Sequence, residues 1–263
     1  RKDVCLDVAL GRLGRLTFPA ARLEETDGLD GHLVESHQRH GHGYLGNRVR
    51  RREHRGDHED TNDITTKEED QLLANFIEYV NKEKPALIIL EDYNKGVLTE
   101  RIITTVIDYC KTHGIATAVD PKQKNFLAYK GCTIFKPNLK EVKEGLKIAI
   151  ESVDEKNMQK MHKALQENLG HEISFITLSE HGVYYETASK HQLIPTHIRN
   201  IADVSGAGDT VIAVASLVYA ATKNMSLAAE ISNIAGGMVC ELVGTAPINK
   251  KDLEAEAIKL LAK

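Results

Sequence analysis

Short apolar runs that alternate with helical segments restrict the fold of this chain more than any other feature. The runs cover residues 86–90, 115–119, 133–135 and 173–178. Such short runs are typical of strands that are buried on both faces of a sheet. Because a helical segment lies between most of them, the sequence predicts an α/β fold, with a doubly wound, mostly parallel sheet and helices on both faces.

The predicted helices carry start and stop signals. Thr66 and Glu69 have the spacing of a capping box before a helix that must end ahead of Pro85. Thr99 can cap the next helix, and Gly114 can close it. The remaining helices are expected after Asn138, over 154–169, 208–221 and 227–242, and after Asn249, with a hairpin over 183–186 and 192–198.

Residues 1–62 differ in composition from the rest of the chain. They hold ten arginines and one lysine, whereas residues 63–263 hold two arginines and twenty-one lysines. They also show little sustained periodicity. We therefore predict an anomalous segment over 1–62 and a folded α/β domain over 63–263. Three interpretations of the segment stay open: a sequence error such as a wrong reading frame, a basic arm, or a divergent domain, for example a degraded lid.

Charge and cysteine content exclude several classes of function. A net charge of −4 gives no electrostatic case for binding nucleic acid or an anionic membrane. No apolar run approaches the roughly 18–20 residues of a membrane span. The four cysteines form no C-x-x-C pair, which argues against a disulfide framework or a zinc site. We expect a cytoplasmic protein that acts on a small molecule.

The stretch 203–210, Asp-Val-Ser-Gly-Ala-Gly-Asp-Thr, predicts a phosphate-binding turn at the start of a helix. The backbone N–H groups of Gly206, Ala207 and Gly208 can hold an anion there, because a helix N-terminus carries unpaired donors and partial positive charge. Asp209 lies where it can take a proton from an attacking hydroxyl. The alternatives are a tightly packed turn and a carboxylate that only favours the helix dipole.

Polar residues also follow each predicted strand, where ligands bind in sheets of this type. They are Asp92, Asn94 and Lys95 after the first run, Lys122 after the second, Asn138 and Glu141 after the third, and Ser179 and Gly182 after the fourth. The competing interpretations are a plain helix cap for Asn138 and solvated surface charges for Lys95, Lys122 and Glu141.

Together these motifs resemble the ribokinase-type, or PfkB-like, sugar kinases over residues 63–263. The resemblance rests on D-x-x-G-A-G-D at 203–209, P-N-x-x-E at 137–141 and N-x-x-G-G at 233–237. Within that family, the strings at 92–98, 119–122 and 136–141 are similar to heptose 7-phosphate kinases, which form the kinase part of bifunctional ADP-heptose synthases. The chain has no G-x-x-x-x-G-K-[ST] motif, so a P-loop enzyme is not indicated.

The resemblance implies a role for each of these residues. Asp209 would be the general base, and the 206–208 turn would stabilise the transferring phosphoryl group. Lys122, Asn138 and Glu141 would hold Mg²⁺ and the phosphates of ATP, and Glu141 would contact Mg²⁺ through a water molecule. The residues around the nucleotide would be Ser179, Gly182, Asn233 and Gly237. Asp203 and the Ser205 carbonyl match positions that hold a monovalent cation such as K⁺. Asp92, Asn94 and Lys95 would contact the sugar, with Lys95 suited to a distal phosphate.

The predicted reaction is ATP-dependent phosphorylation of the anomeric hydroxyl of D-glycero-D-manno-heptose 7-phosphate, on the route to ADP-heptose and lipopolysaccharide core. The alternatives are another sugar or sugar-phosphate kinase of the family and a non-catalytic ligand-binding relative. Related kinases carry a sugar-binding loop and lid strands, through which they dimerise, and nothing in 1–62 matches these parts. We expect a homodimer and a separate nucleotidyltransferase in the same pathway.

Overall fold

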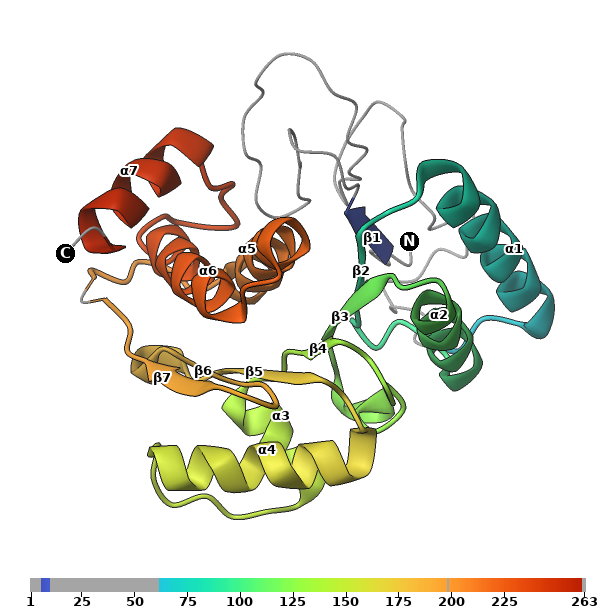
Figure 1. The fold of residues 1–263 in the computed structure, drawn as a ribbon, viewed down its shortest axis with the longest axis horizontal. Helices are drawn as coiled ribbons and strands as arrows, with labels where there is room; N and C mark the ends of the chain where they lie inside the picture. The colour runs from blue at the N-terminus through green and yellow to red at the C-terminus, as the bar shows by residue number, and fades with distance from the viewer. Residues whose placement is uncertain (1–5, 10–61, 198, 262–263) are drawn as a thin grey trace, which may run out of the picture.

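The computed structural model describes residues 6–9, 62–197 and 199–261. Within these ranges the strands form one sheet in the same order as in the chain (Figure 1). The strands are β1 (Leu6–Ala9), β2 (Leu87–Glu91), β3 (Ala116–Asp120), β4 (Ile134–Phe135), β5 (Ile173–Thr177), β6 (Val183–Glu186) and β7 (His191–Ile194). Strands β2 to β5 are parallel, and antiparallel pairing adds β1 at one side and β6 and β7 at the other.

The helices follow the strands as the alternating pattern predicts. The α-helices are α1 (Thr66–Glu83), α2 (Glu100–Thr112), α3 (Leu139–Leu146), α4 (Glu155–Leu169), α5 (Ala207–Thr222), α6 (Met225–Val239) and α7 (Lys250–Leu261). Two short 3₁₀ turns, η1 (Gln123–Asn125) and η2 (Ser179–His181), lie in the loops that follow β3 and β5. The predicted α/β fold, with a parallel centre to the sheet and helices on both faces, is confirmed.

The sheet is buried on both faces because its side chains alternate between two cores. In β2, Ile88 and Leu90 pack with α1 and α2, whereas Leu87 and Ile89 pack with α5. Figure 1 shows the same layering, with α5 and α6 on one side of the sheet and α1, α2 and α4 on the other. This two-sided burial explains why the strands appear in the sequence as uninterrupted apolar runs.

The first capping box lies one residue earlier than predicted. Thr65 caps α1, and its hydroxyl accepts a hydrogen bond from the Glu68 N–H while the Glu68 carboxylate accepts one from the Thr65 N–H. Glu69, which was predicted to complete the box, is instead buried and accepts hydrogen bonds from Thr99 and Arg101. Two consecutive threonines and two consecutive glutamates give both registers the same spacing, so the sequence alone could not separate them.

Two other predicted elements had wrong boundaries. The second strand of the hairpin ends at Ile194 rather than at 198, because Pro195 has no N–H to continue the ladder. Helix α6 begins at Met225, where the Asn224 side chain caps it, and ends at Val239 rather than at 242. The caps predicted at Thr99, Asn138 and Gly170 are all present.

Strand β1 lies inside the segment that was set apart by composition, and its pairing with β2 was not predicted. Residues 1–5 and 10–61 of that segment lie outside the described residues, so the proposed division at residue 62 stays a prediction.

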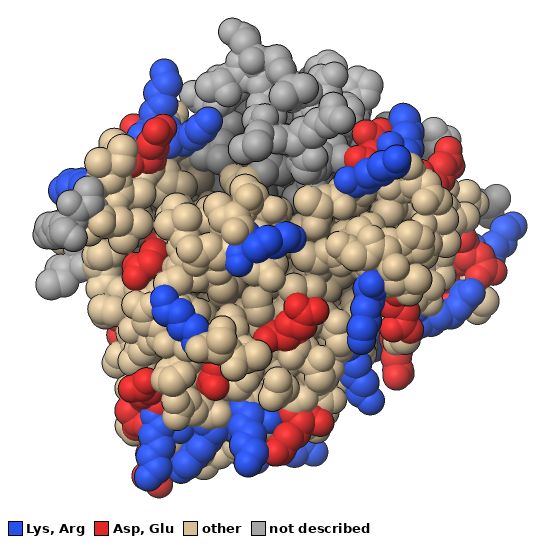
Figure 2. Space-filling view, viewed as in Figure 1, with Lys and Arg blue, Asp and Glu red and all other residues tan. Residues whose placement is uncertain are grey.

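On the face drawn in Figure 2, basic and acidic side chains of the described residues are interspersed, most densely along the edge over α4. None of the helices in the described ranges is both long and apolar enough to span a bilayer.

Candidate active site

The carboxyl ends of β2 and β3 meet the N-terminus of α5. Glu91 ends β2, Asp120 ends β3, and Asp209 lies in the first turn of α5. One carboxylate oxygen from each of the three lies within 4.8 Å of the others. Parallel strands bring their carboxyl ends to one edge of the sheet, and the glycine turn delivers Asp209 to the same place. The structure therefore assembles an acidic centre from segments that are far apart in the sequence.

The glycine turn has the geometry of a helix N-terminus that is open to an anion. Gly206 is the N-cap and has a φ of 78°, a conformation that favours glycine. The first α-helical bond runs from the Thr210 N–H to the Gly206 carbonyl. The Ala207 N–H is already bonded to the Val204 carbonyl at 3.2 Å. Of the predicted anion donors, the Gly208 N–H is therefore better suited than that of Ala207, which keeps an internal partner.

A buried ion pair lies beside this turn. Lys136 Nζ is 3.1 Å from Asp120 Oδ2, and the two side chains are only 3% and 8% exposed. Burial raises the pKa of Asp120 above its ordinary value, and the positive charges of Lys136 and Lys122 oppose that rise. A Cβ atom at Gly208 would lie 3.9 Å from Lys136 Nζ, so the ammonium group faces the glycine turn directly.

The predicted cofactor residues Lys122, Asn138 and Glu141 form one connected group. Glu141 Oε2 accepts a hydrogen bond from the Asn138 N–H, and the Asn138 side chain caps the Glu141 N–H in return. Lys122 Nζ donates to Glu141 Oε1 at 2.9 Å. Burial alone would lower the pKa of Lys122, but Asp120 and Glu141 raise it above its ordinary value. Lys122 is therefore a charged side chain, 36% exposed and held next to the acidic centre.

The loop after β2 brings Tyr93 to the predicted base. The Tyr93 hydroxyl donates to Asp209 Oδ2 at 3.1 Å. Asp92 has internal partners, because its Oδ1 accepts from the Asn94 N–H and its Oδ2 accepts from the buried Tyr129 hydroxyl at 2.8 Å. Lys95 is half-buried in the same loop. A substrate contact by Asp92, Asn94 and Lys95 stays a prediction, and the structure gives Asp92 a role in holding the loop.

The predicted cation site also has an internal structure. Asp203 Oδ1 accepts hydrogen bonds from the Ser205 N–H and hydroxyl, and Oδ2 accepts one from the Gly244 N–H. These bonds lower the pKa of Asp203 below its ordinary value. They join the start of the glycine turn to the 240s loop, whose Thr245 methyl would lie 3.1 Å from a Cβ at Gly206. A monovalent cation at Asp203 and Ser205 stays a prediction.

Three of the predicted nucleotide residues converge on the segment after β7. A Cβ at Gly182, whose φ is 90°, would lie 2.0 Å from the Ile194 carbonyl oxygen. Asn233 donates to the Pro195 carbonyl at 2.9 Å, and a Cβ at Gly237 would lie 2.9 Å from Arg199 Nε. Ser179 is exposed at the end of β5. Gly182 is thus required by its backbone contact and its positive φ, and Gly237 leaves room for the Arg199 side chain, whether or not a nucleotide contacts them.

Sequence reasoning gave no role to Glu91, Lys136 or Tyr93. All three lie at or just after the carboxyl end of a strand, which was the available signal. Their partners, Asp120 and Asp209, lie between 16 and 118 residues away in the chain. Conversely, Glu141 is not part of the acidic centre formed by Glu91, Asp120 and Asp209.

In this fold the N-terminus of α5, the buried Lys136, the partly exposed Lys122 and three carboxylates lie together at one edge of the sheet, an arrangement that suits phosphoryl transfer. The chain belongs to the pfkB family of carbohydrate kinases, because the model of that family matches residues 42–252. The predicted family and the predicted enzyme class, a carbohydrate kinase, are thereby confirmed.

Individual relatives agree with this assignment. The chain is 34% identical over 187 residues to the bifunctional protein HldE of Syntrophotalea carbinolica, covering 70% of this chain and 37% of the relative. It is 35% identical over 200 residues to the protein of the same name from Campylobacter jejuni subsp. jejuni serotype O:2, covering 76% and 42%. The chain thus spans less than half of the length of these relatives.

Solved structures support the ribokinase-like fold. Phosphofructokinase-2 from Escherichia coli, in complex with potassium, superimposes with a TM-score of 0.66 at 16% identity, covering 76% of this chain and 64% of that one. Ribokinase from Arabidopsis thaliana, complexed with ribose and ATP, superimposes with a TM-score of 0.56 at 16% identity, covering 74% and 60%. At these identities the likeness concerns the fold alone.

Proposed function

We propose that this chain is an ATP-dependent kinase that phosphorylates the anomeric hydroxyl of D-glycero-D-manno-heptose 7-phosphate to give the 1,7-bisphosphate. The observation that carries the proposal is the position of Asp209. Its carboxylate lies at the N-terminus of α5 and accepts a hydrogen bond from the loop that resembles the heptose kinases. Two bifunctional HldE proteins, at 34% and 35% identity, support the choice of sugar.

Asp209 would remove the proton from the acceptor hydroxyl as its oxygen attacks the γ-phosphorus of ATP. The helix N-terminus and the ammonium groups of Lys136 and Lys122 would balance the negative charge that moves toward ADP. Phosphoryl transfer has a loose transition state, so positioning and charge neutralisation supply most of the rate, and one carboxylate is sufficient as base. Removing such a base costs about 10²–10⁴ in rate.

The side chains present fit a divalent cation. Oxygen ligands are what Mg²⁺ prefers, and the acidic centre supplies three carboxylates within 4.8 Å. Each oxygen of Glu141 has one hydrogen-bond donor, which leaves lone pairs for a water ligand of the ion. When bound, Mg²⁺ would neutralise phosphate charge. We propose Glu91 and Asp120 as candidate ligands, in addition to the predicted Asn138 and Glu141.

The acceptor is tested with a panel of sugars. Purified enzyme with ATP and Mg²⁺ is offered heptose 7-phosphate, fructose 6-phosphate and ribose, and sugar-dependent ADP formation is measured. The proposal predicts the highest kcat/KM with heptose 7-phosphate. Turnover of ribose or fructose 6-phosphate with none of heptose 7-phosphate would sink the choice of sugar and favour another kinase of the family. ATP binding without turnover of any sugar would favour a non-catalytic relative.

The other parts of the expected biology stay predictions. These are the homodimer, the separate nucleotidyltransferase, the K⁺ site and the cytoplasmic location. Dependence on K⁺ is checked by measuring the same kcat/KM in potassium and in tetramethylammonium buffers of equal ionic strength.

A further inference from the structure

A sugar kinase with a competent base must keep that base from activating water. Bound ATP is exposed to a large excess of solvent, and a water molecule can occupy space that the larger sugar hydroxyl will later fill. If Asp209 is the base, as the proposed function states, something must limit its access to water before the sugar arrives.

The hydroxyl of Tyr93 is hydrogen-bonded to one oxygen of the Asp209 carboxylate. It donates to Asp209 Oδ2 at 3.1 Å, across 116 residues of sequence. A carboxylate oxygen that already accepts a hydrogen bond is a weaker acceptor for a second proton donor, because part of its charge is satisfied. The phenol thus takes one of the two acceptor positions of Oδ2, so fewer positions remain at which Oδ2 can deprotonate a water molecule.

The loop around Tyr93 is held independently of that contact. Asp92 Oδ1 accepts from the Asn94 N–H at 2.7 Å, and Asp92 Oδ2 accepts from Tyr129, which is fully buried. At the other end, the Gly96 carbonyl accepts from the Ile64 N–H at 2.8 Å. The backbone therefore keeps its place when the Tyr93 hydroxyl is removed, and the hydroxyl itself is not needed to fix the loop.

The Tyr93 side chain remains 40% exposed, so an incoming sugar can reach and replace it. This combination of a fixed backbone and an accessible phenol suits a contact that is made in the empty acceptor site and exchanged on binding.

We propose that Tyr93 is a positioning residue that caps the catalytic base and suppresses hydrolysis of ATP until the acceptor sugar takes its place. In the suppressed reaction, the oxygen of water would bond to the γ-phosphorus as the bond to the β–γ bridging oxygen breaks. The bond electrons would leave with ADP, and the proton of water would pass to Asp209 and then to solvent.

The test measures phosphate release from ATP and Mg²⁺ without any sugar. Tyr93→Phe is expected to raise this rate between about threefold and tenfold, because tenfold corresponds to about 1.4 kcal/mol, the worth of one hydrogen bond. The added Asp209→Asn change should remove the gain. Tyr109→Phe is the matched control, since the Tyr109 hydroxyl donates to Asn81 at 3.1 Å on the surface of α1 and α2, and its rate should equal that of wild type.

A Tyr93→Phe rate equal to or below that of wild type overturns the proposal, and so does a gain that persists with Asp209→Asn. Tyr93→Leu, which also lacks the hydroxyl, is measured with it, and the thermal midpoint of each variant shows that it is folded. Sugar phosphorylation by wild type is assayed separately. Failure there counts against the proposed sugar, while the hydrolysis result stands on its own because no sugar is present.

Discussion

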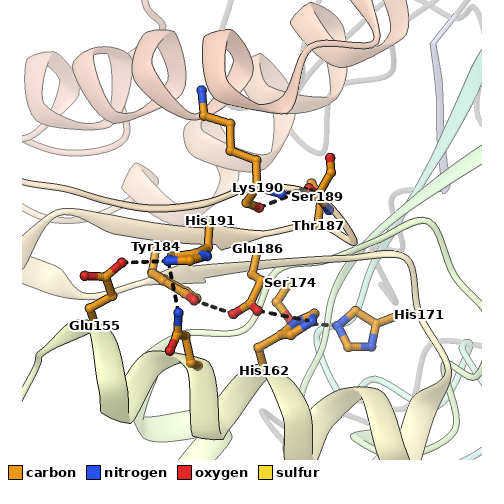
Figure 3. Close-up of polar contacts among 11 residues, drawn as sticks. Glu155, His162, His171, Ser174, Tyr184, Glu186, Thr187, Ser189, Lys190 and His191 are labelled. Atoms are coloured by element: carbon orange, nitrogen blue, oxygen red, sulfur yellow. Dashed lines mark hydrogen bonds and ion pairs between the residues drawn. The ribbon is translucent and has the colours of Figure 1, made fainter.

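Lowering the pH should destabilise this protein through two buried histidines, His162 on α4 and His171 just after that helix (Figure 3). His162 Nδ1 lies 2.9 Å and His171 Nε2 lies 2.6 Å from the hydroxyl of Ser174 on β5. The hydroxyl carries one hydrogen, so it can donate to one ring and must accept from the other. On the far side of His162, the Glu186 carboxylate is 3.8 Å from Nε2 and also accepts from the Tyr184 hydroxyl.

Burial, and then the neighbouring His162, lower the pKa of His171 from 6.5 to about 4. A histidine with a lowered pKa in the folded state is protonated more readily after unfolding. Its contribution to stability is therefore complete above pH 6.5 and is lost as the pH falls from 6.5 to 4. Each unit of pKa difference corresponds to about 1.4 kcal/mol, so the full loss is about 3 kcal/mol, of which about 2 kcal/mol is already lost at pH 5.

The assay is urea unfolding at pH 7.5 and at pH 5.0. The free energy of unfolding of wild type should fall between the two values, and His171→Gln should reduce that fall by about 2 kcal/mol because glutamine does not titrate. The control is His113→Gln, at an exposed position after α2, which should keep the wild-type difference. An equal fall in wild type and His171→Gln would refute the reasoning.

Three further predictions concern single side chains. Lys122→Met should raise the KM for ATP about tenfold or more in steady-state kinetics, because it removes a positive charge that is predicted to contact the phosphates of ATP. Gly182→Ala should lower unfolding free energy by more than about 2 kcal/mol, because its Cβ meets a carbonyl oxygen; Gly170→Ala, with open space around it, should cost only about 1 kcal/mol. Lys136→Met should cost about 3–5 kcal/mol in urea unfolding because it leaves the buried Asp120 with only the more distant Lys122, at 4.0 Å, as a counter-charge, and Lys136→Met with Asp120→Asn should cost less; equal costs would contradict the pairing.

Local signals were sufficient for most of the fold. Thr99, Asn138 and Gly170 each fix a helix end through bonds to residues within four positions, so the sequence contains the whole cause. The apolar runs predicted strands because burial on both faces leaves no polar alternation. The prediction of α1 was one residue out at its cap because adjacent Thr and Glu pairs make two registers equivalent.

The site could be predicted only in part. Ligands bind beyond the carboxyl ends of parallel strands, and this principle pointed to the correct loops. It identified Lys122, Asn138 and Glu141, which the structure joins by hydrogen bonds. It could not show that Tyr93 reaches Asp209, because that contact depends on how the β2 loop and the α5 N-terminus approach each other in three dimensions. Such long-range pairings leave no periodicity or spacing in the chain.

The most direct test of the whole account is phosphoryl transfer by Asp209→Asn. Asparagine keeps the shape of the side chain but cannot take a proton, so the kcat of sugar phosphorylation should fall at least about 10²-fold. Binding of an ATP analogue, measured by calorimetry, should stay close to that of wild type. Asp108→Asn, at an exposed position on α2, is the control and should leave both quantities unchanged. An Asp209→Asn enzyme that retains kcat within about threefold of wild type would contradict the assignment of the base, because a positioned base supplies at least 10²-fold.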